Sequence, residues 1–123
     1  APSHQPGLVL LVEDNLDLRS SVRDMLTELG HSVVEASSVF EARALWDGLP
    51  DIALILSDLV LQGEETGLDL GAHALRTQTP MYFMTSLPPS HDLHQRATQI
   101  APVIPKPFAG EALSIFLTSK DVL

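Results

Sequence analysis

Apolar residues fall in five short runs along the chain, and the segments between the runs carry apolar residues at helical spacing or helix-capping residues. Continuous apolar runs of this length are typical of strands that are buried on both faces of a parallel sheet. Enough chain separates consecutive runs for one helix each. The predicted strands are residues 8–12, 32–35, 52–56, 80–84 and 103–104.

Capping residues indicate where several of the helices begin and end. Gly30 is expected to stop the first helix. Ser38 and Glu41 have the spacing of a capping box, and Ser90 is the expected cap of the fourth helix. The predicted helices span approximately residues 18–29, 38–49, 67–76, 90–100 and 111–117.

This alternation of strands and helices predicts an α/β fold. We expect a doubly wound, five-stranded parallel sheet with helices on both faces and right-handed crossovers. In such sheets the ligand site lies beyond the carboxyl ends of the strands, where the strand order reverses. The residues that follow each strand are therefore the first candidates for function.

Composition limits the protein to a few classes. The chain has 123 residues, which suits one domain of ordinary size, and it contains no cysteine, which excludes disulfides and thiolate metal sites. No apolar run approaches the length of a membrane span, so we expect no membrane contact and a cytoplasmic location. Seven basic and 16 acidic residues give a net charge of −9, which argues against direct binding to nucleic acid.

Polar side chains stand where the predicted strands end. Glu13 and Asp14 follow the first strand, Asp58 the third, Thr85 the fourth and Lys106 the fifth. Because the carboxyl ends of parallel strands meet at one edge of a sheet, we expect these side chains to converge. Three carboxylates placed together repel one another unless a cation offsets them, and an oxygen-only ligand set that keeps waters suits Mg²⁺.

The same set of residues has the chemistry to receive a phosphoryl group. A bound cation would neutralise the phosphoryl oxygens that the carboxylates otherwise repel. One carboxylate can then act as the nucleophile and form an aspartyl phosphate. Lys106 would pair with a phosphoryl oxygen or with the acceptor carboxylate, and the Thr85 hydroxyl could donate to another phosphoryl oxygen.

Four motifs in order along the chain carry a family resemblance. They are Glu13-Asp14-Asn15, Asp58-Leu59, Met84-Thr85-Ser86 and Lys106-Pro107-Phe108. With each motif at the end of the appropriate strand, the chain resembles the receiver domain of two-component response regulators. The resemblance covers residues 8–118, so we interpret residues 1–7 as a linker or a cloning remnant and residues 119–123 as a C-terminal tail.

The resemblance implies a flavodoxin-like sheet with the strand order 2-1-3-4-5, and it implies a role for each site residue. Asp58 would be the phosphoacceptor. Asp14 and Asp58 would bind Mg²⁺ directly and Glu13 mainly through water, while the backbone carbonyl of Val60 would supply a further ligand.

Thr85 and Lys106 would complete the catalytic set with Asp58. The resemblance also implies that the peptide bond between Lys106 and Pro107 is cis. Such a domain is not a conventional enzyme, although it catalyses its own phosphorylation and a slow autodephosphorylation.

The resemblance further implies partners and an output surface. The phosphoryl group would come from the phosphohistidine of a histidine kinase or from a histidine phosphotransfer protein. Phosphorylation would alter the surface of the fourth helix, fifth strand and fifth helix, through which two copies could also form a homodimer. The loop residues Val60, Leu61 and Gln62 resemble those of receivers within hybrid sensor histidine kinases. We therefore expect either a stand-alone receiver or one domain of a larger regulator or hybrid kinase.

One position departs from the family pattern. Val103 stands three residues before the lysine, where many receivers have a Tyr or Phe that rotates together with the threonine. The two-residue switch is therefore incomplete, and a degenerate receiver that acts only as a protein-interaction module is the main alternative.

Other interpretations are weaker. An aspartyl-phosphate hydrolase of the haloacid dehalogenase type requires Asp-x-Asp after the first strand, which residues 11–16 do not supply. A flavodoxin-like cofactor binder would have a phosphate loop rich in Ser, Thr and Gly at the same place. Glu13 and Asp14 could also merely cap the first helix, whose positive dipole end favours acids.

Overall fold

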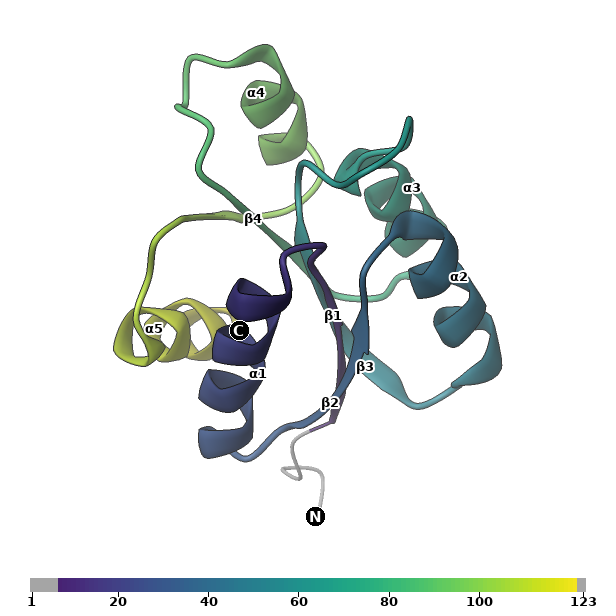
Figure 1. Ribbon diagram of the computed structural model, residues 1–123, viewed down its shortest axis with the longest axis vertical. Helices are drawn as coiled ribbons and strands as arrows, with labels where there is room; N and C mark the ends of the chain where they lie inside the picture. Colours follow the sequence, from purple (N-terminus) through teal and green to yellow (C-terminus); the bar gives the residue numbers. More distant parts are fainter. Residues whose placement is uncertain (1–6, 122–123) are drawn as a thin grey trace.

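The computed structural model describes residues 7–121 and contains a five-stranded parallel sheet in the order β2-β1-β3-β4-β5 (Figure 1). This order confirms the expected doubly wound, flavodoxin-like fold. The strands are β1 (Leu8–Val12), β2 (Ser32–Ala36), β3 (Ile52–Asp58), β4 (Met81–Thr85) and β5 (Val103–Pro105). The helices are α1 (Leu16–Glu28), α2 (Val39–Gly48), α3 (Gly67–Thr77), α4 (Asp92–Thr98) and α5 (Gly110–Asp121).

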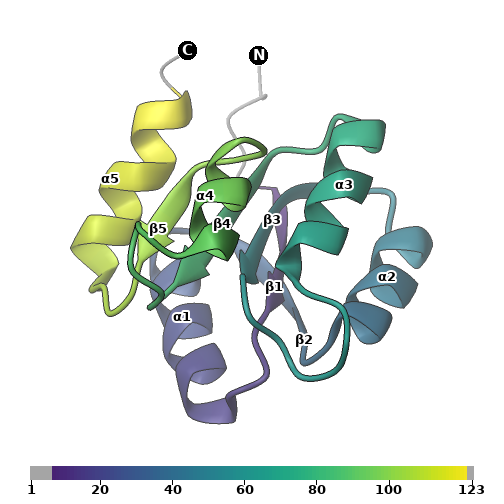
Figure 2. The ribbon, with the colours of Figure 1, turned by 90° about the horizontal axis from the view of Figure 1, so that it is seen from above.

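Helices cover both faces of the sheet. Figure 2 shows α1 and α5 together on one side and α2 and α3 on the other, and the buried side chains of α4 join those of α2 and α3. Successive residues of β1 point to opposite faces, so Leu10 and Val12 pack under α2 and α3, whereas Val9 and Leu11 pack under α1 and α5. This two-sided burial explains why the strands are continuous apolar runs rather than alternating ones.

The strands β2, β3, β4 and β5 each end one or two residues later than predicted, and the shifts of β3 and β4 bear on the site. β3 extends to Asp58, because the ladder continues until Asp58 pairs with Met84. β4 covers residues 81–85 rather than 80–84, since Pro80 has no N–H to donate to the ladder. Asp58 and Thr85 are therefore the last residues of their strands and are held by the sheet itself.

The predicted cap of the fourth helix is wrong. His91, not Ser90, caps α4, and its Nδ1 accepts a hydrogen bond of 3.0 Å from the backbone N–H of Leu93. The reason is a tight turn in which the N–H of His91 bonds the carbonyl of Pro88, which places Ser90 inside the turn. Within residues 7–121, no helix has both the length and the apolarity needed to cross a membrane.

The start of α3 lies directly against the end of β3. The backbone N–H of Gly67 donates to the carbonyl of Leu59 at 2.9 Å. A Cβ at Gly67 would lie 2.5 Å from the carbonyl oxygen of Asp58, so a side chain at this position would push α3 away from the loop that follows Asp58. This close approach requires glycine.

We therefore expect Gly67→Ala to lower the free energy of unfolding by about 1–3 kcal/mol, as overpacking in a closed site does. The matched control is Gly48→Ala at the end of α2, where an added Cβ meets nothing within 4 Å. That substitution should be neutral or stabilise by about 0.5 kcal/mol, because alanine is the better helix former. Urea unfolding of both variants measures the difference, and equal midpoints would contradict the steric argument.

Candidate functional site

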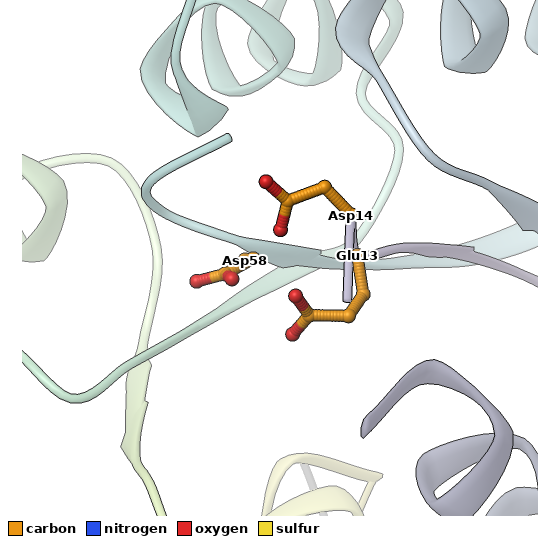
Figure 3. Close-up of side chains that lie close together, drawn as sticks. All are labelled: Glu13, Asp14 and Asp58. Carbon is orange, nitrogen blue, oxygen red and sulfur yellow. The ribbon is translucent and has the colours of Figure 1, made fainter. Parts of the chain in front are cut away.

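The three predicted carboxylates lie together at the carboxyl ends of β1 and β3 (Figure 3). These strands are neighbours in the sheet. One carboxylate oxygen each of Glu13, Asp14 and Asp58 lies within 4.8 Å of the other two. The convergence expected from the strand assignment is therefore present.

Glu13 is the most buried of the three, with an exposed fraction of 1%. Its Oε2 accepts a hydrogen bond of 3.2 Å from the N–H of Asn15, and its own N–H donates to the carbonyl of Ala36 in β2. The side chain of Asn15 caps α1 by accepting from the N–H of Leu18. Because Asn15 fills the cap position, Glu13 and Asp14 are not the helix caps of the weaker interpretation.

Lys106 reaches across the sheet edge from the end of β5. Its Nζ lies 3.0 Å from Asp58 Oδ2 and 3.1 Å from Glu13 Oε1, and it donates a hydrogen bond to each. Burial by itself would lower the pKa of Lys106, but the charges of Asp58 and Glu13 and their hydrogen bonds outweigh burial and raise the pKa. Lys106 therefore stays an ammonium ion. The peptide bond between Lys106 and Pro107 is cis, as expected.

One lysine does not neutralise this cluster. Three carboxylates and one ammonium leave two uncompensated negative charges at a largely buried site. Within the described chain, the Asp14 carboxylate has no hydrogen bond or ion pair, and Asp58 Oδ1 is likewise unbonded. Unsatisfied carboxylate oxygens in a net negative pocket are the donor set that a hard divalent cation prefers, so the residues present fit Mg²⁺.

Thr85 is buried at the end of β4 and is joined to Lys106 through the backbone, because the N–H of Lys106 donates to the Thr85 carbonyl at 2.9 Å. The Thr85 hydroxyl accepts a hydrogen bond of 3.1 Å from the N–H of Leu87. The hydroxyl hydrogen is left available for donation. The structure records no hydrogen bond between Thr85 and Asp58 among the described residues, so Thr85 stands beside the cluster rather than within it.

Val60 follows Asp58 by two residues, and the residue is 48% exposed. In the described chain, no hydrogen bond links Val60 to the acidic cluster. Its carbonyl stays a predicted ligand of the cation. Val103 is half-buried in β5 and packs with the core under α2, α3 and α4.

Sequence reasoning missed an ion pair beside the cluster. Arg19 in α1 donates from Nη1 to the backbone carbonyl of Glu13 at 3.0 Å and from Nε to Glu35 Oε1 at 3.1 Å. A signal was present, because an arginine in the first turns of a helix and a glutamate at the end of the adjacent strand can meet once β2 is known to lie beside β1. Only the three-dimensional arrangement shows that the arginine also donates to the Glu13 carbonyl.

Comparisons with known proteins agree with this geometry. A sequence model described as the response regulator receiver domain matches residues 9–117. The solved structure of the chemotaxis protein CheY4 of Vibrio cholerae is similar at 27% identity and a TM-score of 0.76, covering 96% of this chain and 99% of that one. The signal receiver domain of a modulated diguanylate cyclase from Desulfovibrio desulfuricans G20 is similar at 27% identity and a TM-score of 0.81, covering 93% of this chain and 92% of that one.

A receiver domain protein from Clostridium thermocellum is 17% identical with a TM-score of 0.78, and covers 95% of this chain and 99% of that one. That likeness bears on the fold alone. Among curated proteins, no sequence match was found.

Because the Asp14 carboxylate is unpaired beside two others, we expect Asp14→Asn to stabilise the protein without Mg²⁺ by ~0.5–1 kcal/mol. Millimolar Mg²⁺ is expected to raise the melting temperature of the unsubstituted protein through preferential binding to the folded state, and Asp14→Asn should weaken that rise. Thermal melting with and without MgCl₂ measures both effects. A metal-free Asp14→Asn protein that is less stable than the parent would mean that the cluster is already compensated.

Removing the Lys106 ammonium leaves two buried carboxylates without their cation, so Lys106→Met should lower the free energy of unfolding at neutral pH by ~2 kcal/mol. Because the folded-state pKa of Lys106 is raised, this contribution is complete below the ordinary lysine pKa of about 10.4 and is lost as the pH rises through the folded-state pKa. Urea unfolding of both proteins from about pH 7 upward should show a constant gap that closes only in that alkaline range.

The control is Arg96→Met, which removes an exposed cation whose pair with Asp92 spans 3.8 Å. That substitution should change the stability by no more than about 0.5 kcal/mol. A gap for Lys106→Met that is no larger than the control's would show that the ion pairs contribute nothing to stability.

Proposed function

The chain belongs to the response regulator receiver domain family and, on that premise, we propose that Asp58 is the phosphoacceptor of a two-component phosphorelay. The observation that carries the proposal is the setting of Asp58. It lies at the end of a central strand, 6% exposed, with one oxygen held by Lys106 and the other unbonded beside Glu13 and Asp14. The matched range supports a domain that spans residues 8–118.

The transfer follows from the chemistry of a carboxylate nucleophile. The unbonded Oδ1 of Asp58 attacks the phosphorus of a phosphohistidine, a P–O bond forms, and the P–N bond to the imidazole breaks. The imidazole leaves with its electron pair and takes up a proton. Lys106 holds the other carboxylate oxygen of Asp58 and presents its ammonium to the incoming phosphoryl oxygens.

Asp14 and Asp58 are the proposed direct ligands of Mg²⁺, with Glu13 acting mainly through water and the Val60 carbonyl as a further ligand. When bound, Mg²⁺ supplies the positive charge that offsets repulsion between the carboxylates and the phosphoryl oxygens. The two uncompensated negative charges of the cluster support this assignment. Attack by water on the phosphorus of the acyl phosphate would break its bond to Asp58, release inorganic phosphate and restore the carboxylate in a slow autodephosphorylation.

A cleft beside the acceptor supports a protein phosphodonor. It encloses about 270 Å³ between α1 and the loop after β5, and its walls run from Glu13 and Lys106 to Leu18, Met25 and Phe108. An apolar cleft that opens next to the acceptor can receive side chains of a histidine kinase or a histidine phosphotransfer protein while the phosphohistidine faces Asp58.

The proposed output is a change at the surface of α4, β5 and α5, which could also mediate a homodimer. The Thr85 hydroxyl accepts from the N–H of Leu87, which lies in the loop between β4 and α4. Donation from Thr85 to a phosphoryl oxygen would draw the hydroxyl away and release Leu87. Because Val103 supplies no aromatic ring, this loop is the proposed route of the signal.

Incubation with a small phosphodonor and Mg²⁺ should add the mass of one phosphoryl group to the protein, and Asp58→Asn should abolish the addition. Omission of Mg²⁺ should slow the reaction strongly. Intact-mass spectrometry measures the product, and hydroxylamine sensitivity identifies it as an acyl phosphate. The matched control is Asp17→Asn, which changes an exposed acid in the first turn of α1 and should leave the yield unchanged.

Addition that persists in Asp58→Asn would place the acceptor elsewhere. Absence of addition in the unsubstituted protein would favour the alternative of a degenerate receiver that acts as a protein-interaction module.

A further inference from the structure

The position of the Asp14 carboxylate depends on the backbone that carries it. Asp14 follows the last residue of β1 by two positions and precedes the cap of α1, so it lies in neither element. Its carboxylate makes no hydrogen bond or ion pair in the described chain. The peptide unit between Glu13 and Asp14 therefore matters for this carboxylate, because it places the Cα atom from which the side chain projects.

Arg19 holds that peptide unit. Its Nη1 donates to the Glu13 carbonyl at 3.0 Å, and this carbonyl belongs to the same planar peptide group as the N–H of Asp14. Fixing the carbonyl fixes the plane, and the plane places the N and Cα atoms of Asp14, from which its side chain projects. The other end of the Glu13 residue is already tied, because its N–H donates to Ala36 in β2.

Glu35 anchors the arginine in turn. Glu35 lies in β2 opposite Leu11 of β1, and its Oε1 accepts from Arg19 Nε at 3.1 Å. The Arg19 side chain is only 17% exposed and that of Glu35 28% exposed, so the pair is partly shielded from water. The planar guanidinium presents Nε and Nη1 in a rigid fork that fixes the geometry of both bonds, whereas the donors of an ammonium group rotate on a flexible stem. Arg23 also pairs with Glu35, at 3.3 Å, but among the hydrogen bonds of residues 7–121 none joins Arg23 to Glu13.

We propose that Arg19, anchored by Glu35, is a positioning residue that sets the affinity of the site for Mg²⁺ by fixing the Glu13–Asp14 peptide. The proposal rests on the proposed function, since it takes Asp14 to be a ligand of the cation. It assigns a role to residues outside the acidic cluster, which touch neither the cation nor the phosphoryl group.

Charge and positioning predict opposite effects, which makes the proposal testable. Arg19 is a cation near a cation site, so through charge alone its removal would tighten Mg²⁺ binding. Through positioning, its removal frees the peptide and weakens binding. Groups that orient metal ligands typically contribute a factor of about 10–100 in metal affinity.

The experiment is isothermal titration calorimetry of MgCl₂ into the unsubstituted protein, Arg19→Met, Arg19→Lys and the control Arg23→Met. We expect both Arg19 variants to raise the Mg²⁺ dissociation constant by about tenfold. Arg19→Met removes both hydrogen bonds, and Arg19→Lys keeps the charge but loses the rigid fork that fixes their geometry. Arg23→Met removes the same charge from the same helix and the same Glu35, and should leave the constant within about twofold or tighten it.

A second readout separates positioning from general damage to the fold. In phosphorylation by a small phosphodonor, the Mg²⁺ concentration for half-maximal rate should rise in the Arg19 variants, while the rate at saturating Mg²⁺ should return close to that of the parent. Far-UV circular dichroism and melting without Mg²⁺ check that each variant is folded. If Arg19→Met does not fold, Arg19→Lys alone tests the proposal.

The outcomes are distinct. Arg19 variants that bind Mg²⁺ as tightly as the parent or more tightly overturn the inference while leaving the proposed function intact. An equal loss in Arg23→Met also overturns it, since the carbonyl bond would then be irrelevant. If the unsubstituted protein binds no Mg²⁺, the proposed function itself fails and the inference with it.

Discussion

Mutual repulsion among three carboxylates at one edge of the sheet is the constraint on which the site depends. Glu13, Asp14 and Asp58 come from two adjacent strands, so the register of β1 against β3 forces them together. Lys106 offsets this repulsion only in part, through its bonds to Glu13 and Asp58. A site left with net negative charge favours a bound cation, and on the proposed function Mg²⁺ would recover the energy that the fold gives up there.

Lys106 also connects strands that are far apart in the sheet. Its side chain reaches from β5 to the ends of β1 and β3, and its backbone N–H bonds the carbonyl of Thr85 in β4. A change in charge at Asp58 therefore acts directly on the residue that links it to β4 and β5. On the proposed function, this arrangement would provide a route from Asp58 to the loop before α4 that does not need an aromatic residue at Val103.

Residues around the acidic cluster hold its backbone in place through specific contacts. The N–H of Asn15 bonds the Glu13 carboxylate, Arg19 bonds the Glu13 carbonyl, and α3 approaches Asp58 so closely that Gly67 admits no side chain. None of these groups carries out phosphoryl chemistry. They fix the backbone from which the acidic side chains project, and side chains without partners of their own, such as that of Asp14, depend on this most.

The sequence by itself determined the α/β alternation, the placement of all five strands within about two residues, and the set of polar residues at the strand ends. Those features are local, since apolar runs, caps and breakers act over a few residues. The cap of α4 could not be predicted in the same way, because Ser90 lies inside a turn that begins at Pro88.

Only the tertiary structure decided which partners the site residues have. Lys106 bonds both Glu13 and Asp58. The Thr85 hydroxyl accepts from the N–H of Leu87, and Arg19 donates to the Glu13 carbonyl. These contacts join residues from different elements, and a side chain's choice among several partners depends on distances of a few tenths of an ångström that no local pattern encodes.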